Sequence, residues 1–159
     1  MTNPFNGKRT DRASRIINAS PENIYKALID PKAVATWRPP EGMKCTVHSF
    51  EPQEGGNFRM AFEYTNTNHK VGGKTSEHAD VFHGKFLQLL PDKRVIESVE
   101  FESNDPAFTE PMKVITILTP LSEGTKVTII CEDVPAAINP EDHEKGMTST
   151  LENLAAFVE

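Results

Sequence analysis

The sequence predicts an α+β fold, in which a curved antiparallel sheet of about seven strands surrounds a long C-terminal helix. Three observations carry this prediction. Apolar and polar residues alternate with a period of two through much of 43–132. Residues 140–158 carry the clearest helical period of the chain, and the strand-like runs are separated by connections of hairpin length. A chain of 159 residues fits a single domain, predicted over 11–159 after a flexible N-terminal segment, 1–10.

The first elements are a short strand over 12–18 and two short helices. Ser20 is a typical helix cap, and Pro21 suits the first helical position. The residue before Pro31 avoids the helical region, so the first helix is expected to stop there. A second short helix over 31–36 follows it directly.

Six further strands are expected in hairpin succession, at about 43–48, 58–64, 78–90, 94–101, 112–119 and 125–132. Hairpin connections make the sheet antiparallel. Gly84 lies inside a strand, which predicts a bulge or a close approach of neighbouring atoms. Residues 65–77 are polar and contain two glycines, which is typical of a mobile loop.

The last element is an amphipathic helix over 140–158. Asn139 provides a cap and Pro140 a favourable first residue. The apolar stripe of this helix is Met147, Leu151, Leu154 and Val158. Because one face is apolar and the other polar, we expect the stripe to be buried against the concave side of the sheet.

Composition excludes several functions. A net charge of −6 argues against nucleic acid and against anionic membrane surfaces as partners. No segment approaches the ~20 apolar residues of a membrane span, and the first residues lack a signal-peptide core, so a cytoplasmic location is expected. Cys45 and Cys131 lie in strand-like runs and are predicted to be reduced. The histidines lack metal-ligand spacing, and we expect neither a metal nor a cofactor.

Several segments match a known family in order and spacing. They are Ala19–Leu28 with Asp30-Pro31, then Trp37, Gly55-Gly56, Gly84–Leu89 with Pro91, Thr119-Pro120 to Gly124-Thr125, and Gly146-Met147 with Leu151 and Leu154. Through them, residues 13–158 resemble the START-like SRPBCC superfamily, and within it the activator of Hsp90 ATPase homologue domain. The resemblance implies a helix-grip (START/Bet v 1-like) fold. The family often has tryptophan where this chain has Met147.

A ligand site is predicted between the sheet and the C-terminal helix. The candidate ligand-binding residues are Trp37, Phe58, Met60, Phe62, Val95, Glu97, Val99, His143, Met147, Leu151 and Leu154. Glu97 shares a strand face with Val95 and Val99. It is either a polar handle or general base in the cavity, or a carboxylate paired with an arginine such as Arg59 or Arg94.

Two further candidate residues keep alternative interpretations. Trp37 is either a core side chain or a wall of the cavity. His143 is either a ligand donor at the rim or a surface histidine.

Three functions follow as hypotheses. The first is binding of a small hydrophobic molecule in the cavity, with Trp37 and the 65–77 loop near the entrance. The second is a protein-interaction module acting on a chaperone. The third is a cyclase or hydrolase of a small aromatic or polyketide substrate, with Glu97 or Tyr64 as acid–base groups.

The outer face of the sheet offers a possible homodimer contact. This contact would use Ile115, Ile117 and Ile130, because strands that are apolar on both sides are covered on both sides.

Overall fold

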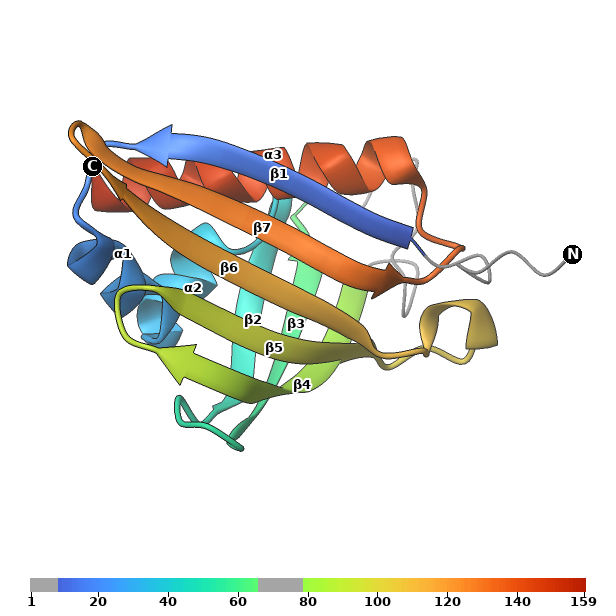
Figure 1. Cartoon of the computed structure of the whole chain (residues 1–159). Coiled ribbons are helices and arrows are strands. Elements are labelled where there is room, and N and C mark those ends of the chain that lie inside the picture. Colours follow the sequence, from blue (N-terminus) through green and yellow to red (C-terminus); the bar gives the residue numbers. More distant parts are fainter. Residues whose placement is uncertain (1–8, 66–78) are drawn as a thin grey trace, which may run out of the picture.

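The computed structural model describes residues 9–65 and 79–159 (Figure 1). Its elements, in chain order, are β1 (Arg9–Ile17), α1 (Pro21–Leu28), α2 (Pro31–Trp37), β2 (Met43–Phe50), β3 (Asn57–Tyr64), β4 (Ala79–Leu90), β5 (Arg94–Phe101), the 3-10 turn η1 (Pro106–Phe108), β6 (Met112–Leu121), β7 (Gly124–Val134) and α3 (Pro140–Val158). The predicted 65–77 loop, apart from Thr65, lies outside the described residues.

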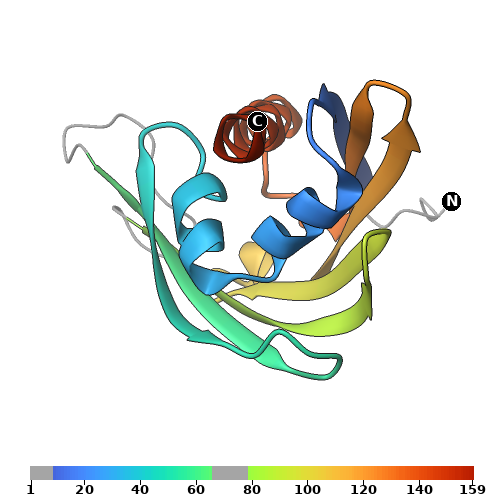
Figure 2. The ribbon, with the colours of Figure 1, turned by 90° about the vertical axis from the view of Figure 1, so that its left-hand side faces the viewer.

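The seven strands form one antiparallel sheet in the order β1-β7-β6-β5-β4-β3-β2. The first strand therefore pairs with the last, and β5 is the middle strand. Figure 2 shows the sheet curving around α3, which is viewed along its axis, with α1 and α2 at one end of the concave side. This arrangement confirms the predicted helix-grip α+β fold.

Helix α3 begins and ends where the sequence predicts. The Asn139 side chain accepts a hydrogen bond from the Asp142 backbone N–H at 3.1 Å, and Pro140 occupies the first turn. Met147, Leu151 and Leu154 are buried against the sheet. The N-cap and the apolar stripe both indicate the same helix, which explains why the bounds of α3 could be predicted from the sequence.

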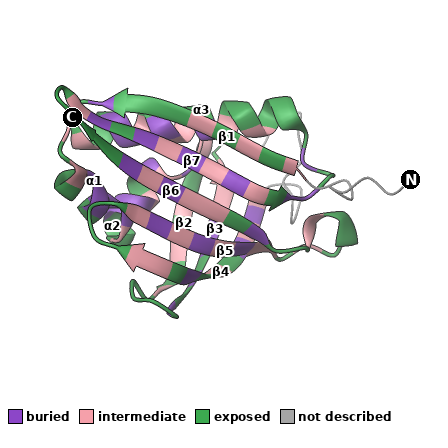
Figure 3. Ribbon diagram, in the orientation of Figure 1, coloured by how far each residue is buried: buried purple, intermediate pink, exposed green. Residues whose placement is uncertain are grey.

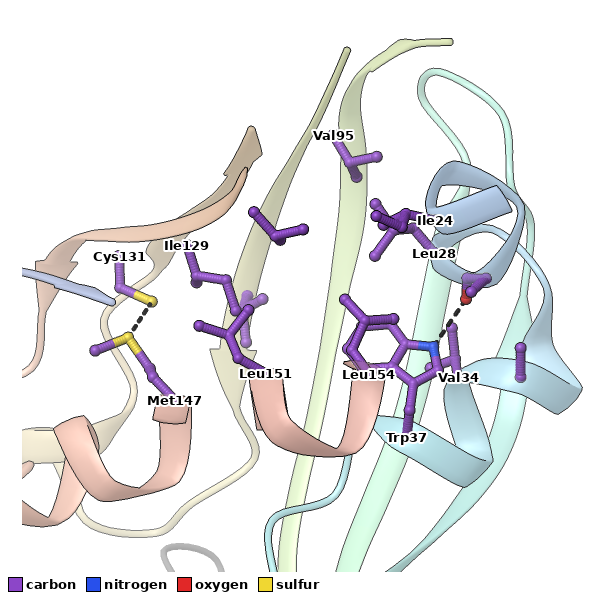
Figure 4. Close-up of a cluster of buried hydrophobic side chains, with 14 of the residues drawn as sticks. Ile24, Leu28, Val34, Trp37, Val95, Ile129, Cys131, Met147, Leu151 and Leu154 are labelled. Carbon is purple, nitrogen blue, oxygen red and sulfur yellow. Dashed lines mark hydrogen bonds between the residues drawn. The ribbon is translucent and has the colours of Figure 1, made fainter. Parts of the chain in front are cut away.

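The two short helices are linked to each other. Asp30, expected only to end α1, caps α2 by accepting from the Lys32 N–H at 2.9 Å. The Trp37 indole N–H donates to the Ala27 carbonyl oxygen at 2.9 Å (Figure 4). This bond fixes the end of α2 against α1 and holds the indole inside the molecule.

Strand β1 differs from the expectation. It begins at Arg9 rather than Arg12, so two residues of the predicted flexible segment 1–10 belong to the sheet. Arg9 pairs with Val134 across the β1–β7 ladder. This pairing joins the first and last strands of the sheet, and the polar sequence of an edge strand carries little local signal for it.

Gly84 is a site of close approach, as expected. A Cβ atom built at this position would lie 1.9 Å from the Ser98 carbonyl oxygen and 2.6 Å from the Phe58 ring. A register shift follows nearby, between Phe86 and Gln88. The missing side chain at Gly84 thus lets the Phe58 ring lie flat against β4.

Burial alternates along the strands, most clearly on β5, β6 and β7 (Figure 3). The side chains that face α3 form the core together with those of α1 and α2. Aromatic rings pack together in the core at one end of the sheet, where the ring centroids of Phe58 and Phe86 lie 5.1 Å apart. Within 9–65 and 79–159, no helix is long and apolar enough to span a membrane.

Candidate functional site

A cavity of about 750 Å³ lies between the concave face of the sheet and α3. Side chains from β3, β4, β5, β6 and β7 form one wall, and the N-terminal half of α3 forms the other. The end of α2 contributes Trp37 and Arg38. A volume of this size is typical of sites for small organic molecules.

The strongest polar feature of the wall is an ion pair between Arg38 and Glu97. Glu97 projects from the middle strand and is only 3% exposed. Arg38 Nη1 lies 2.9 Å from Glu97 Oε2, and Nη2 lies 3.2 Å from Oε1. Two parallel N–H donors on one carboxylate give the bidentate geometry that fixes both groups.

Aromatic rings surround the guanidinium of Arg38. Its central carbon lies 5.9 Å from the centroid of the Phe58 ring and 5.8 Å from that of Phe82. Burial opposes the charged form of Arg38, but the charge and hydrogen bonds of Glu97 outweigh it and raise the pKa of Arg38 above its ordinary value. The pair is therefore a charged unit inside an apolar wall.

Helix α3 holds the Arg38 backbone in place. The Thr150 hydroxyl donates to the Arg38 carbonyl oxygen at 3.0 Å, and the Asn153 amide donates to the Pro39 carbonyl oxygen at 2.9 Å. The Ser149 hydroxyl oxygen accepts from the Glu41 N–H at 2.9 Å. The segment that carries Arg38 is thus attached to the helix that closes the cavity.

Thr116 supplies a hydroxyl to the same wall. Its side chain is 7% exposed and faces the cavity from β6. Within the described part of the chain, the structure shows no hydrogen bond of this hydroxyl. This hydroxyl stays accessible from the cavity, which makes Thr116 a candidate contact for a ligand.

Tyr64 and Asp80 bring polar groups from β3 and β4. Asp80 is buried, and both residues line the cavity. Burial raises the pKa of the Tyr64 phenol, and the charges of Asp80 and Asp142 raise it further. The phenol is therefore protonated at neutral pH.

His143 is fixed at the cavity wall by β1. Its Nδ1 lies 2.7 Å from Oδ2 of Asp11, whose carboxylate also accepts from Arg9 Nε at 2.9 Å. Burial raises the pKa of Asp11, but the hydrogen bonds from Arg9 and His143 outweigh burial and lower it overall. His143 is half-buried and lines the cavity, so its position matches the first of the two alternatives, a residue at the rim.

Most of the predicted ligand-binding residues line the cavity. These are Trp37, Phe62, Val95, Glu97, Val99, His143 and Met147. Tyr64, an acid–base candidate, lines it too. Trp37 has both of its predicted roles, since its indole is buried in the core and also contacts the cavity.

Four predicted residues lie in the filled core instead, at the end of the concave side that α1 and α2 occupy. These are Phe58, Met60, Leu151 and Leu154. Figure 4 shows Leu154 beside Trp37 at the end of α2, and Leu151 on the side of Ile129. The apolar stripes of β3 and α3 continue past the cavity, so alternation alone does not show where the open space ends.

The prediction that Arg59 or Arg94 pairs with Glu97 is wrong. Arg59 pairs with Glu102 at 2.8 Å, and Arg94 Nε donates to the Gln88 side chain at 2.7 Å. Arg38 was missed because it follows a helix and belongs to no periodic pattern. Thr116, in contrast, was detectable, because it alternates with Ile115 and Ile117, which the sequence assigns to the outer face.

The cysteines offer little reactivity. Both are free thiols, as expected. Burial raises the pKa of Cys131 to about 12 and that of Cys45 to about 11, so both are protonated at neutral pH. The Cys131 thiol lies 3.8 Å from the Met147 sulfur (Figure 4). In the ranges 9–65 and 79–159, no three His, Cys, Asp or Glu residues are grouped to hold a metal ion.

Solved structures with the same fold come from several bacteria. A crystal structure of a protein from Chromobacterium violaceum is 35% identical, covers 94% of this chain and 96% of its own, and has a TM-score of 0.83. A Rhodobacter sphaeroides protein is 19% identical, with coverage of 98% and 95% and a TM-score of 0.75. The AHSA1-like protein from Aeromonas hydrophila is 17% identical, with coverage of 94% and 92% and a TM-score of 0.70.

The family comparison agrees with these structures. The family model described as activator of Hsp90 ATPase homolog 1-like protein matches residues 18–159. No protein with a curated description matches the chain. The matched range includes α1, α2, α3 and every strand from β2 to β7. The chain therefore belongs to the activator of Hsp90 ATPase homolog 1-like family, within the START-like SRPBCC superfamily.

Proposed function

We propose that this protein binds a small, mostly apolar molecule in the cavity between the sheet and α3. Membership of the family supports a ligand-binding or interaction domain. The observation that favours ligand binding is the cavity itself, which stays open at about 750 Å³ although α1 and α2 fill the other end of the concave side. Its mainly apolar wall would provide affinity through burial of ligand surface, at roughly 25 cal/mol per Å².

The polar groups of the wall would orient the ligand. Arg38 and Glu97 are held to each other, and the Arg38 backbone is held to α3, so these groups are already in place before binding. Preorganised polar groups give specificity without the entropy cost of ordering them. The ligand would therefore be mostly apolar with one polar region.

The test uses a cavity-filling variant and a matched control on the next residue. Val114 faces the cavity from β6, whereas Ile115 faces the outside of the sheet. We expect Val114→Phe to weaken binding of the neutral fluorescent dye Nile red at least about tenfold, because the larger ring occupies the ligand's space. Ile115→Phe should bind the dye as the unchanged protein does.

Two results would contradict the proposal. One is equal dye binding by both variants, with circular dichroism showing both folded. The other is an unchanged protein that does not bind the dye at all. Native mass spectrometry of protein purified from cells adds an independent readout, since a carried molecule should be present in the unchanged protein and absent from Val114→Phe.

A second candidate function is protein contact through the outer face of the sheet. Ile96, Ile115 and Ile130 lie opposite one another on β5, β6 and β7, and Ile117 lies on the same face. All four remain partly accessible. This apolar row favours either the homodimer contact or a chaperone contact.

The two forms of protein contact are separable. Light scattering at tens of micromolar should give twice the monomer mass for a homodimer, and Ile115→Lys should restore the monomer. A purified Hsp90 whose ATPase rate is unchanged by the protein would count against the chaperone contact.

The enzymatic alternative has less support from the site. Both carboxylate oxygens of Glu97 already accept hydrogen bonds from Arg38. The raised pKa of Tyr64 keeps its phenol protonated near neutral pH. Neither group is thereby arranged as a general base.

A further inference from the structure

The chemistry of the cavity wall narrows the class of ligand. Resting on the binding function proposed above, we propose that the ligand is uncharged and places a hydroxyl group between the Arg38–Glu97 pair and Thr116. The rest of the ligand is apolar and occupies the cavity beyond them. Amphiphiles with a carboxylate or an ammonium headgroup are disfavoured.

The ion pair offers donors and acceptors with no net charge. One N–H from each terminal nitrogen of Arg38 is used by Glu97. In the part of the chain that the structure describes, the Arg38 side chain makes no other hydrogen bond. Its remaining N–H groups can therefore donate to a ligand, and the free lone pairs of the carboxylate can accept from it. A hydroxyl group can take part in both kinds of hydrogen bond.

Thr116 supplies the opposite side of this subsite. Glu97 pairs in register with Val114, so Thr116 is its diagonal neighbour on the same face of the sheet. Diagonal positions lie about 7–8 Å apart at the backbone, and the side chains that project from them into the cavity come within reach of one ligand hydroxyl. The Thr116 residue is largely buried in the wall, and its hydroxyl has no hydrogen-bond partner among the described residues and stays accessible from the cavity. A ligand hydroxyl would satisfy it.

The charges around the cavity disfavour an anion. Besides the mutually neutralised pair, the part of the wall that the structure describes carries the acidic residues Glu41 and Asp142, the basic residue Lys145, and Asp80, which is engaged in an interaction of its own. His143 is already engaged by Asp11. A carboxylate headgroup would add negative charge to an acidic, poorly solvated site, and an ammonium at the inner end would face the Arg38 guanidinium.

The experiment compares three ligands with one chain length. Decan-1-ol, decanoate and decylammonium are titrated at pH 7 against the protein loaded with Nile red, and displacement is measured by fluorescence. We expect decan-1-ol to displace the dye at concentrations about tenfold lower than either charged ligand, because a hydrogen bond is gained without desolvating an unpaired charge.

Two matched variants test whether the preference for decan-1-ol depends on the Thr116 hydroxyl. Thr116→Val removes the hydroxyl and keeps the shape, and should weaken decan-1-ol binding about three- to tenfold after correction for the Nile red affinity measured for the variant itself. Thr128→Val is the control, since Thr128 faces the outside of β7. Thr128→Val should change the binding of neither Nile red nor decan-1-ol. Thermal unfolding establishes that both variants are folded.

The outcomes separate this inference from the function on which it rests. Equal binding of decan-1-ol and decanoate, tightest binding of decylammonium, or no effect of Thr116→Val would each overturn the headgroup assignment. In all three cases Nile red would still bind, and the proposed function would stand. Failure of the unchanged protein to bind Nile red and decan-1-ol would overturn both.

Discussion

At the scale of single residues, the most consequential feature is the buried Arg38–Glu97 pair. Its geometry is bidentate, the Glu97 side chain is buried, and the Arg38 side chain is mostly buried. Removing two charges from water is expensive, and their attraction repays this cost only while both partners are present. The pair therefore combines a structural requirement with the polar ligand contact that we propose.

Breaking the pair should destabilise the protein strongly. We expect Glu97→Gln to lower the free energy of unfolding by about 3–5 kcal/mol, because Arg38 is left buried without its counter-charge. Glu102→Gln, which breaks the exposed contact with Arg59, should cost no more than about 1 kcal/mol. Urea denaturation measures both. Equal losses in the free energy of unfolding for the two variants would contradict the structural role of the Arg38–Glu97 pair.

A second residue-scale prediction concerns pH. The pKa of Asp11 is lowered from its ordinary value of 3.8, so its ion pairs contribute stability that is fully present above about pH 4 and is lost as pH falls through the lowered pKa. Asp11→Asn should therefore cost about 1–3 kcal/mol at pH 7. This difference should shrink below pH 4. A difference that stays constant from pH 7 to pH 2.5 would refute the linkage.

At the scale of elements, the sequence predicted the helices and strands that carry a local pattern, such as a cap residue or a regular alternation. The bounds of α3 were predictable because Asn139 and Pro140 mark its start and its apolar stripe gives its period. The inner face of β5 was predictable from strict alternation, which placed Glu97 beside Val95 and Val99. The start of β1 was not, because its pairing with β7 is a long-range contact with little local pattern.

Two glycines test the packing of individual elements. Gly84→Ala should destabilise the protein by about 1–3 kcal/mol, because its Cβ would overlap the Ser98 carbonyl and the Phe58 ring. Gly146→Ala in α3 is the matched control, since a Cβ there meets nothing within 4 Å. It should stabilise by about 0.5–1 kcal/mol through helix propensity. Thermal melts compare the two, and a neutral Gly84→Ala would show that β4 relaxes freely.

At the scale of the whole molecule, the sheet encloses more space than α3 fills. The sequence predicted the enclosure, since a curved sheet and one amphipathic helix leave a concave side to be occupied. It did not predict where the open part ends. Phe58 and Phe62 share one stripe of β3, yet only Phe62 reaches the cavity, because the paired helices α1 and α2 occupy the space near Phe58.

The Arg38–Glu97 contact also belongs to this scale. It joins the end of α2 to the middle strand, and its partners are far apart in the sequence. A pairing of this kind depends on the assembled fold, so periodicity within either segment could not indicate it. The same assembly brings Thr116 into the neighbourhood of the pair.

The most direct measurement is the detection of intermolecular NOEs between bound decan-1-ol and the methyl groups of the labelled protein. If the ligand lies between the sheet and α3, the contacts should fall on the methyls of Val99 and Val114, which face the cavity. Contacts confined to Ile115 and Ile130 on the outer face of the sheet would contradict the account, as would the absence of any contact at saturating ligand.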